Sequence, residues 1–351
     1  MTLFSSPHDA PDELIIQRDI SLKPFNTFGL DATAQYFVSI VDERQFDQLF
    51  YHPLFNSEPH LVLGGGSNIV LTRDFAGMVV HIAHQGINVL DEDETHVLVA
   101  AAAGEVWHDF VRTCLERGWY GLENLALIPG TVGAAPIQNI GAYGVEVEST
   151  FDCLIAFDTA TGCYVHLTHE QCHFGYRDSI FKREAHDRYV ILEVAFKLSK
   201  IPNIKTTYAD VERELTEQKI SQPTPKDVFN AVCAVRQRKL PDPTVMGNAG
   251  SFFKNPVVSY EQYREIGTLH PGIVHYPQKD GTVKLAAAWM IDRCGWKGQS
   301  LGQAGVHANQ ALVLVNRGDA RGEEVLALAN AIMTSVKNRF GVLLTPEPEI
   351  L

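Results

Sequence analysis

Residues 128–146 read IPGTVGAAPIQNIGAYGVE, and this stretch does the most to decide what the chain folds into. The run is dense in glycine and alanine, yet it also carries polar side chains such as Gln138 and Asn139. Small residues allow a large, flat ligand to lie directly against the main chain. Because a structural turn rarely needs so long a run of this kind, we expect a ligand-binding loop here.

A second glycine loop, GGGSN at residues 64–68, directly follows the apolar run of residues 60–63. Three glycines let the main chain turn sharply and bring its N–H groups close to an anion. The loop is neither G-x-G-x-x-G nor a P-loop, and a tight turn between two strands is the alternative reading. Together the two loops fit a dinucleotide, with one at the pyrophosphate and the other beside the ring system.

The apolar patterns around these loops predict a mixed fold. Short apolar runs broken by glycine indicate strands, and apolar residues at helical spacing indicate helices. Thr224, Pro225 and Asp227 mark a capped helix start. We predict strands within residues 60–71, 77–83, 96–103, 151–168, 188–198 and 311–316, and helices over 107–117, 225–240, 285–294 and 325–340. Strands and helices do not alternate regularly, so the expected class is α+β.

The chain as a whole is acidic. Its 351 residues suggest two domains, and 29 Lys+Arg against 42 Asp+Glu give a net charge of −13. This charge disfavours nucleic acid or an anionic membrane as a partner, so an anionic ligand needs a local cluster of cations. We find neither a secretory signal nor an apolar run of about 18 residues that could span a membrane. The six scattered cysteines favour a reducing cytoplasm.

One histidine and cysteine set has the look of a metal site. Cys163, His166, His169 and Cys172 recur at intervals of three. A strand would place the first two on opposite faces, and structural zinc sites usually bring ligand pairs together across turns. We therefore expect no metal.

Three long motifs carry a family resemblance. Residues 128–146, FGYRDSIFK at 174–182 and GNAGSFFKNP at 247–256 closely resemble, in order, those of the bacterial UDP-N-acetylenolpyruvoylglucosamine reductases. The likeness begins at residue 22 and covers nearly the whole chain. It implies an α+β protein with an FAD-binding domain of the vanillyl-alcohol-oxidase (PCMH) type, followed by a smaller α+β substrate-binding domain. Tyr208 and the long linker before it suggest the subclass with a tyrosine-bearing substrate loop.

The resemblance also implies domain bounds and an activity. We expect an N-terminal extension over 1–19, an FAD-binding domain in two subdomains over 20–205, and a substrate-binding domain over 206–351 whose tail returns to the active site. Such enzymes use NADPH and FAD to reduce the enolpyruvyl ether of UDP-N-acetylglucosamine enolpyruvate to UDP-N-acetylmuramate, in peptidoglycan precursor synthesis. The expected partner is a UDP-amino-sugar substrate, with no nucleic acid, membrane or obligate protein partner.

By match to the family motifs, three residues carry the chemistry. Hydride comes from flavin N5, and the resulting negative charge needs stabilising while the neighbouring carbon needs a proton. Arg177 matches the arginine that holds the substrate carboxylate, and Ser251 matches the proton donor. Glu347 matches the C-terminal carboxylate. Taken alone, Arg177 would be read as a surface arginine paired with Asp178, and Ser251 as a turn residue.

The C-terminal motif departs from the family pattern, which has an apolar and then a basic residue after the glutamate. Here Pro348 and Glu349 follow Glu347. Spacing from Phe340 favours Glu347 as the active-site carboxylate, and Glu349 is the alternative. Without the resemblance, both glutamates would be interpreted as part of a frayed acidic tail with no function.

Cofactor and substrate contacts follow from the same match. The expected cofactor-binding residues are Gly64, Gly65, Gly66, Ser67, Asn68, Ile128, Gly130, Gly133, Ala134, Ala135, Ile137, Gly141, Tyr143 and Arg236. The expected substrate-binding residues are Tyr208, Lys239, Asn255 and Gln310. Residues 236–255 hold Arg236, Arg238, Lys239 and Lys254 against Asp242, so a basic pocket can exist within an acidic chain.

Two other functions stay open at this point. One is a flavin oxidase of the same FAD-binding fold that acts on another carbohydrate. The other is a non-catalytic module that binds flavin or a UDP-sugar, which only the altered tail favours.

Overall fold

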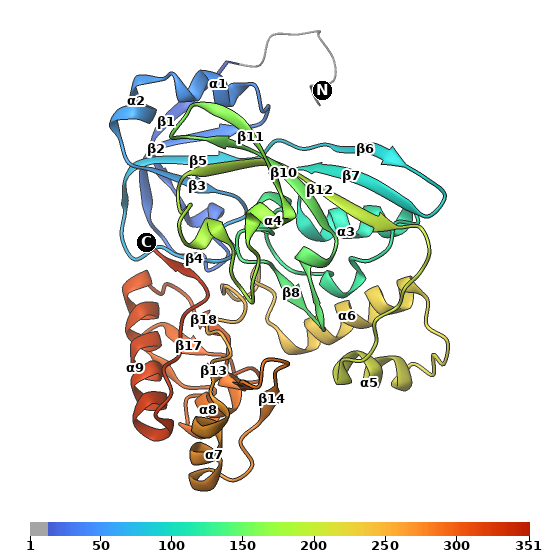
Figure 1. Ribbon diagram of the computed structural model, residues 1–351. Coiled ribbons are helices and arrows are strands. Elements are labelled where there is room, and N and C mark those ends of the chain that lie inside the picture. The colour runs from blue at the N-terminus through green and yellow to red at the C-terminus, as the bar shows by residue number, and fades with distance from the viewer. Residues whose placement is uncertain (1–12) are drawn as a thin grey trace.

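The computed structural model describes residues 13–351 and has an α+β fold (Figure 1). A four-stranded sheet in the order β1-β2-β5-β3 forms one part of the N-terminal half. It consists of β1 (Ile16–Ser21), β2 (Thr33–Ile40), β5 (Phe75–Ile82) and β3 (His60–Leu63), and α1 (Gln45–Phe50) and α2 (Pro53–Ser57) connect β2 to β3. The aromatic residues Phe46, Phe55 and Phe157 join this sheet to the next one in a shared core.

Residues 1–12 of the predicted extension lie outside the described residues. Residues 16–19, also assigned to that extension, belong instead to β1, which pairs antiparallel with β2. Because β1 is an edge strand with mostly exposed side chains, such as Arg18 and Asp19, its sequence has the polar composition of a solvated tail.

A five-stranded antiparallel sheet, β11-β10-β12-β7-β6, forms the second part. Its strands are β6 (Ile87–Glu92), β7 (His96–Ala102), β10 (Phe151–Asp158), β11 (Cys163–Thr168) and β12 (Tyr189–Ser199). The helices α3 (Trp107–Glu116), α5 (Ala209–Glu217) and α6 (Pro225–Lys239) contribute to the same hydrophobic core. The domain boundary predicted at 205/206 is therefore not where the hydrophobic cores separate, because α5 and α6 pack with the residues that precede them.

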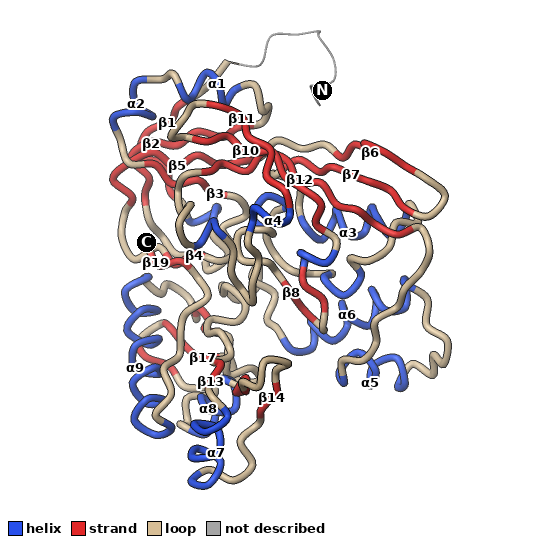
Figure 2. The backbone as a smooth tube through the Cα atoms, in the orientation of Figure 1, coloured by secondary structure: helices blue, strands red, loops and turns tan. Residues whose placement is uncertain are grey.

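The third part of the molecule is a smaller lobe that contains most of the residues after 242 (Figure 2). Its core lies under α9 (Gly322–Phe340), with buried Val325, Leu328, Ile332 and Val336 on one face. The remaining elements of the lobe are α7 (Tyr260–Leu269), α8 (Ala287–Arg293), β13 (Val257–Val258), β14 (His275–Pro277), β15 (Val283–Leu285), β16 (Ser300–Leu301), β17 (Ala304–Val306) and β18 (Leu314–Asn316).

Short elements complete the described chain. The last strand, β19 (Glu349–Ile350), pairs in parallel with β4 (Ile69–Val70), so the C-terminal tail returns to the N-terminal half. The others are β8 (Gly141–Ala142), β9 (Val145–Glu146), α4 (His169–Cys172) and 3-10 turns at Lys23–Phe25, Glu123–Leu125, Val132–Ala134, Val147–Ser149 and Ile180–Lys182. Among residues 13–351, no helix combines the length and the apolar character needed to cross a bilayer.

The predicted long elements are confirmed, and several of their ends differ: α9 begins at Gly322 instead of residue 325, and β5 begins at Phe75 instead of residue 77. The helix expected from residue 285 begins at Ala287, because Leu285 pairs with His275 in a sheet. The strand expected over residues 311–316 is reduced to β18. Cys163 and His166 lie on β11, whereas Cys172 is buried in α4.

Candidate active site

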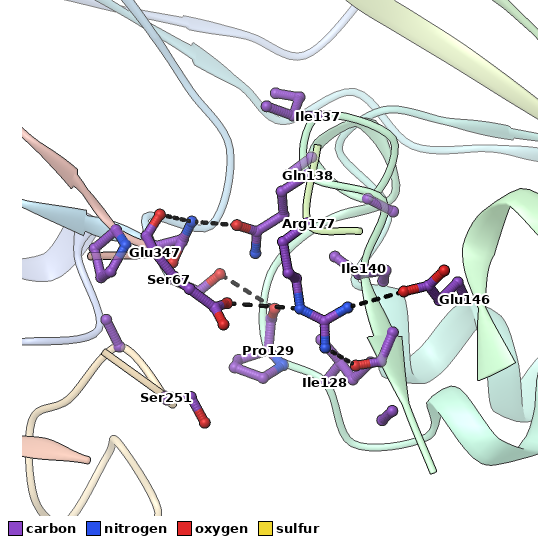
Figure 3. Close-up of a pocket in the computed structure, with 18 of the residues that line it drawn as sticks. Ser67, Ile128, Pro129, Ile137, Gln138, Ile140, Glu146, Arg177, Ser251 and Glu347 are labelled. Atoms are coloured by element: carbon purple, nitrogen blue, oxygen red, sulfur yellow. Dashed lines mark hydrogen bonds and ion pairs between the residues drawn. The ribbon is translucent and has the colours of Figure 1, made fainter. Parts of the chain in front are cut away.

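A cavity of about 1110 Å³ lies where the parts of the molecule meet, and all three predicted catalytic residues line it (Figure 3). Both glycine loops, the FGYR segment, the loop around Ser251 and the C-terminal tail contribute to its walls. So do the four predicted substrate contacts, Tyr208, Lys239, Asn255 and Gln310. Residues that are distant in the sequence thus form one site.

The two glycine loops lie close together, and only the small side chains of Ser67 and Thr131 make contacts across the gap. A Cβ added at Gly64 would lie 2.5 Å from Thr131 Oγ1, and one at Gly65 would lie 3.1 Å from Gly130 Cα. Ser67 Oγ donates to the carbonyl of Pro129 at 3.1 Å. Since Gly64, Gly65 and Gly66 line the cavity and have no side chains, their main chain forms its surface here, which suits the flat ring system and pyrophosphate of the expected cofactor.

Two predicted cofactor residues, Gly130 and Gly133, do not line the cavity. A Cβ at Gly133 would meet Ala103 Cβ at 2.5 Å, and one at Gly130 would meet Ser67 Oγ at 2.7 Å. Gly133 thus allows its loop to pack against Ala103, and Gly130 allows the two glycine loops to approach each other. The other twelve predicted cofactor residues, Gly64, Gly65, Gly66, Ser67, Asn68, Ile128, Ala134, Ala135, Ile137, Gly141, Tyr143 and Arg236, all line the cavity.

Arg177 lies between two carboxylates. Its Nη1 is 3.7 Å from Glu146 Oε1, and its Nε is 3.7 Å from Glu347 Oε2. The carbonyls of Asn139 and Gly141 accept hydrogen bonds from the two terminal nitrogens. Asn139, Tyr143 and Arg177 itself all have positive φ, a conformation that is uncommon outside glycine and that collects at functional sites. The guanidinium is therefore held in one orientation before any ligand arrives.

Glu347 is the buried one of the two candidate carboxylates. Its side chain is 12% exposed, and burial raises its pKa against the opposing effects of Arg177, Lys254 and Lys182. Glu349, at 41% exposure, instead lies 3.2 Å from His186 Nε2. The structure therefore brings Glu347, and not Glu349, to the guanidinium of Arg177.

Ser251 lies on a loop that belongs to the C-terminal lobe, apart from the segments that carry Arg177 and Glu347 (Figure 3). The loop turns at Gly250, whose φ is 68° and whose N–H donates to Asn248 Oδ1 at 2.9 Å. Phe252, the next residue, is fully buried and donates its N–H to the carbonyl of Leu312. Anchors on both sides thus hold the serine at the cavity wall.

The predicted basic cluster is divided in the structure. Arg236 lines the cavity and donates to the carbonyl of Leu127 at 3.1 Å, and burial lowers its pKa. Lys239 also lines the cavity but pairs with Asp210. Arg238 faces away and pairs with Glu214 at 2.7 Å, so it adds no charge to the site.

Two of the predicted substrate contacts, Tyr208 and Asn255, have defined neighbours within the protein. Tyr208 lies edge-on to Tyr143, with ring centroids 5.2 Å apart. Asn255 accepts a hydrogen bond from the N–H of Ala287 at 2.9 Å. Its amide nitrogen is not used in that bond.

Several site residues were missed by the sequence analysis, which named Lys254 only as a cation of the basic run over residues 236–255. Lys284 lies 3.6 Å from the ring centre of Tyr176, and both line the cavity. Lys182 donates to the carbonyl of Glu347 at 3.1 Å, and Lys254 donates to the carbonyl of Arg177 at 3.1 Å. Both lysines lie inside the quoted motifs, which were the available signal. Glu146, the second partner of Arg177, ends the first motif.

Outside the motifs, His186, Asp187 and Glu349 place potential ligand atoms within 4.8 Å of one another. His186 lies between the two carboxylates, at 2.8 Å from Asp187 and 3.2 Å from Glu349. Both imidazole nitrogens of His186 are therefore within hydrogen-bond reach of a carboxylate in this cluster.

Comparison with known proteins identifies the family. Residues 49–166 match the FAD-binding domain model, and residues 242–351 match the model of the UDP-N-acetylenolpyruvoylglucosamine reductase C-terminal domain. The reductase of that name from Chromobacterium violaceum is 52% identical, over 96% of this chain and 99% of that protein. The one from Burkholderia multivorans is 54% identical, over 97% and 99%.

The chain belongs to the UDP-N-acetylenolpyruvoylglucosamine reductase family. Among solved structures, the reductase from Thermus caldophilus aligns over 96% of this chain and 99% of that one, with 22% identity and a TM-score of 0.65, which supports the fold. As a member of this family, the chain is an FAD-dependent oxidoreductase that uses NADPH. The predicted FAD-binding fold with a C-terminal substrate domain is confirmed.

Proposed function

We propose that this reductase converts UDP-N-acetylglucosamine enolpyruvate to UDP-N-acetylmuramate, with Arg177, Ser251 and Glu347 as the catalytic residues. The observation that carries the assignment of residues is the meeting of Arg177 and Glu347 in a cavity that Ser251 also lines. When bound along the two glycine loops, FAD supplies the hydride that reaches the enolpyruvyl methylene. The remaining steps depend on the residues of this chain.

Arg177 holds the substrate carboxylate, where negative charge increases during the reaction. A guanidinium stays charged and can bind two oxygens at once. Since the carbonyls of Asn139 and Gly141 already fix its orientation, little reorganisation is needed when the charge develops.

Glu347 acts in its protonated form, as a hydrogen-bond donor to the same carboxylate. Its burial favours the neutral acid, and a substrate carboxylate nearby would favour it further. A protonated carboxyl group adds a donor to the site without adding a like charge.

Ser251 donates the proton that completes the reduction. A serine hydroxyl is a poor acid, but the carbanion-like species that it meets is a strong base. The anchored loop holds the hydroxyl at the cavity wall, which limits the geometry from which the proton is delivered.

Tyr208, Lys239, Asn255 and Gln310 hold the UDP-amino-sugar in this proposal, and Lys239 contacts its diphosphate. We further propose a cytoplasmic location, which the six free thiols support.

Ser251→Ala tests the assignment by separating the two half-reactions. NADPH should still bleach the absorbance of bound FAD at a near-normal rate, whereas recovery of that absorbance on adding the UDP-enolpyruvyl sugar should slow by about 100-fold or more. Ser57→Ala, at an exposed position, should change neither rate. An unchanged recovery rate in Ser251→Ala would rule out this serine as the proton donor. NADPH consumption that never depends on the sugar would instead favour a flavin oxidase.

A further inference from the structure

The C-terminal tail, residues 345–351, runs from the C-terminal lobe to the FAD-binding half of the molecule, and Glu347 lies where the tail passes from one to the other. On the side of the C-terminal lobe, the carbonyl of Phe252 accepts the N–H of Glu347 at 2.9 Å. On the other side, the carbonyl of Asn68 accepts the N–H of Glu349 at 2.9 Å, and β19 pairs with β4. The direction of the Glu347 side chain therefore depends on how its own main chain is held.

Two side chains from the FAD-binding half hold the carbonyl of Glu347. Lys182 Nζ donates to it at 3.1 Å, and Asn68 Nδ2 donates at 3.2 Å. Asn68 is itself fixed, because the same Nδ2 donates to Gln138 Oε1 at 2.7 Å. Within residues 13–351 Lys182 forms no ion pair with a carboxylate, and in the cavity wall its ammonium group donates to the carbonyl of Glu347.

Lys182 also shares a short, rigid segment with Arg177. Ser179 between them is fully buried, and its hydroxyl donates to the carbonyl of Ile137 at 2.6 Å while accepting the N–H of Phe181. Lys182 then follows in the turn Ile180–Lys182. One segment thus contacts both the carboxyl group and the main-chain carbonyl of Glu347.

We propose that Lys182 is a positioning residue that sets the direction of the Glu347 side chain toward Arg177 through its bond to the main chain. This inference rests on the proposed role of Glu347 as a hydrogen-bond donor to the substrate carboxylate. Without the ammonium group, Asn68 alone holds the carbonyl, and the tail can rotate the carboxyl group away from Arg177.

Charge gives the inference a second consequence. Arg177, Lys182 and Lys254 face Glu347 and oppose the rise in its pKa, while Glu146 lies across Arg177 and Glu349 is paired with His186. Removing the Lys182 charge therefore raises the pKa of Glu347 further. If protonated Glu347 is the active form, the alkaline limb of the turnover profile moves to higher pH.

The test compares Lys182→Met, Lys182→Arg and the exposed control Lys226→Met as FAD-loaded proteins. In Lys182→Met we expect kcat to fall about tenfold or more with little change in KM for the UDP-sugar, and the alkaline limb to move upward. Amide hydrogen exchange in residues 345–351 should rise in the same variant. Lys182→Arg should recover most of kcat and of the exchange protection, and Lys226→Met should match the parent protein.

Two results would overturn the inference: unchanged tail exchange in Lys182→Met, or a fall in kcat with an alkaline limb that does not move. Glu347→Gln separates this failure from that of the proposed function. If Glu347→Gln keeps full turnover, the assigned role of Glu347 is wrong. If Glu347→Gln loses turnover and Lys182→Met does not, only the positioning role is wrong. Should Lys182→Met fail to retain FAD, Lys182→Gln, which keeps a donor without the charge, takes its place in the pH profile only: its alkaline limb should still move upward, and a limb that stays in place would overturn the inference.

Discussion

At the level of a single residue, the contacts of Arg177 predict that lysine will not replace arginine in this site. Its guanidinium reaches two carbonyls and two carboxylates at the same time. A lysine ammonium is a point charge and cannot keep this planar arrangement. We expect Arg177→Lys to lower kcat by about 100-fold or more while FAD absorbance stays normal, as measured by steady-state kinetics and spectra. Arg238→Lys, at an ion pair outside the cavity, should have little effect. Full activity in Arg177→Lys would contradict the role proposed for the planar guanidinium group of Arg177.

The ion pair between Arg188 and Asp158 lies outside the cavity and should make the stability of the fold depend on pH. Arg188 donates to both oxygens of Asp158, whose side chain is 3% exposed, and these bonds lower the pKa of Asp158 to about 2. The pair therefore stabilises the fold fully above the unfolded-state pKa of about 3.9, and this stability is lost as pH falls through about 2.

Asp158→Asn should accordingly lower the free energy of unfolding by about 2 kcal/mol at pH 7, and the difference from the parent should vanish toward pH 2. Urea unfolding across this pH range measures it. Asp109→Asn removes a half-exposed pair with Arg112 and should cost under about 1 kcal/mol. If the difference in the free energy of unfolding between Asp158→Asn and the parent protein is as large at pH 2 as at pH 7, the ion pair is not the source of that difference.

Much of the candidate site could be predicted residue by residue, because the family motifs include the side chains that would meet the substrate. Arg177, Ser251 and Glu347 all line one cavity, although their catalytic roles stay predictions. Lys182 was missed because its partner is a main-chain carbonyl 165 residues away. A carbonyl leaves no mark in the sequence, so only the fold could reveal this contact.

Among the structural elements, the turn after β3 depends on one glycine more than on its neighbours. Gly66 has a φ of 56°, and a Cβ there would lie 2.0 Å from the carbonyl oxygen of Phe25. Gly29 has a similar φ of 64° but nothing within 4 Å of an added Cβ. We expect Gly29→Ala to cost about 1 kcal/mol of stability, from backbone strain alone.

Gly66→Ala should cost about 3 kcal/mol, because the clash adds to the strain, and it should also weaken FAD retention. Thermal unfolding and the FAD content of the purified variants measure the two effects. Equal losses in the two variants would show that the contact with Phe25 does not constrain the loop.

Among the helices and strands, the long ones could be predicted from the sequence and the shortest ones could not. Helices such as α3, α6 and α9 were predicted because their apolar spacing extends over ten residues or more. Strands of two or three residues, such as β13, β16 and β19, carry no measurable period, and long-range pairing decides them. β19 exists because β4, about 280 residues earlier, offers a partner.

At the level of the whole molecule, the net charge of −13 is distributed unevenly. The cavity is lined by six cations, Arg177, Lys182, Lys205, Arg236, Lys239 and Lys284, and by five acids, Glu146, Glu148, Asp210, Glu347 and Glu349. The acidity therefore belongs mainly to the rest of the chain. Local cations and glycine N–H groups can attract anionic ligands although the protein as a whole is acidic.

Because all parts of the molecule contribute walls to this cavity, removing FAD should destabilise the whole fold and not only the glycine loops. A ligand that binds only the folded state, at 100 times its Kd, adds about 2.7 kcal/mol. For a chain of this size we expect removal to lower Tm by roughly 5–10 °C, and added FAD to restore it. FMN, which lacks the adenylyl half, should restore less if the pyrophosphate lies on residues 64–68. Equal Tm values with and without FAD would mean that the cavity is fully stable on its own, and equal rescue by FMN would place the pyrophosphate elsewhere.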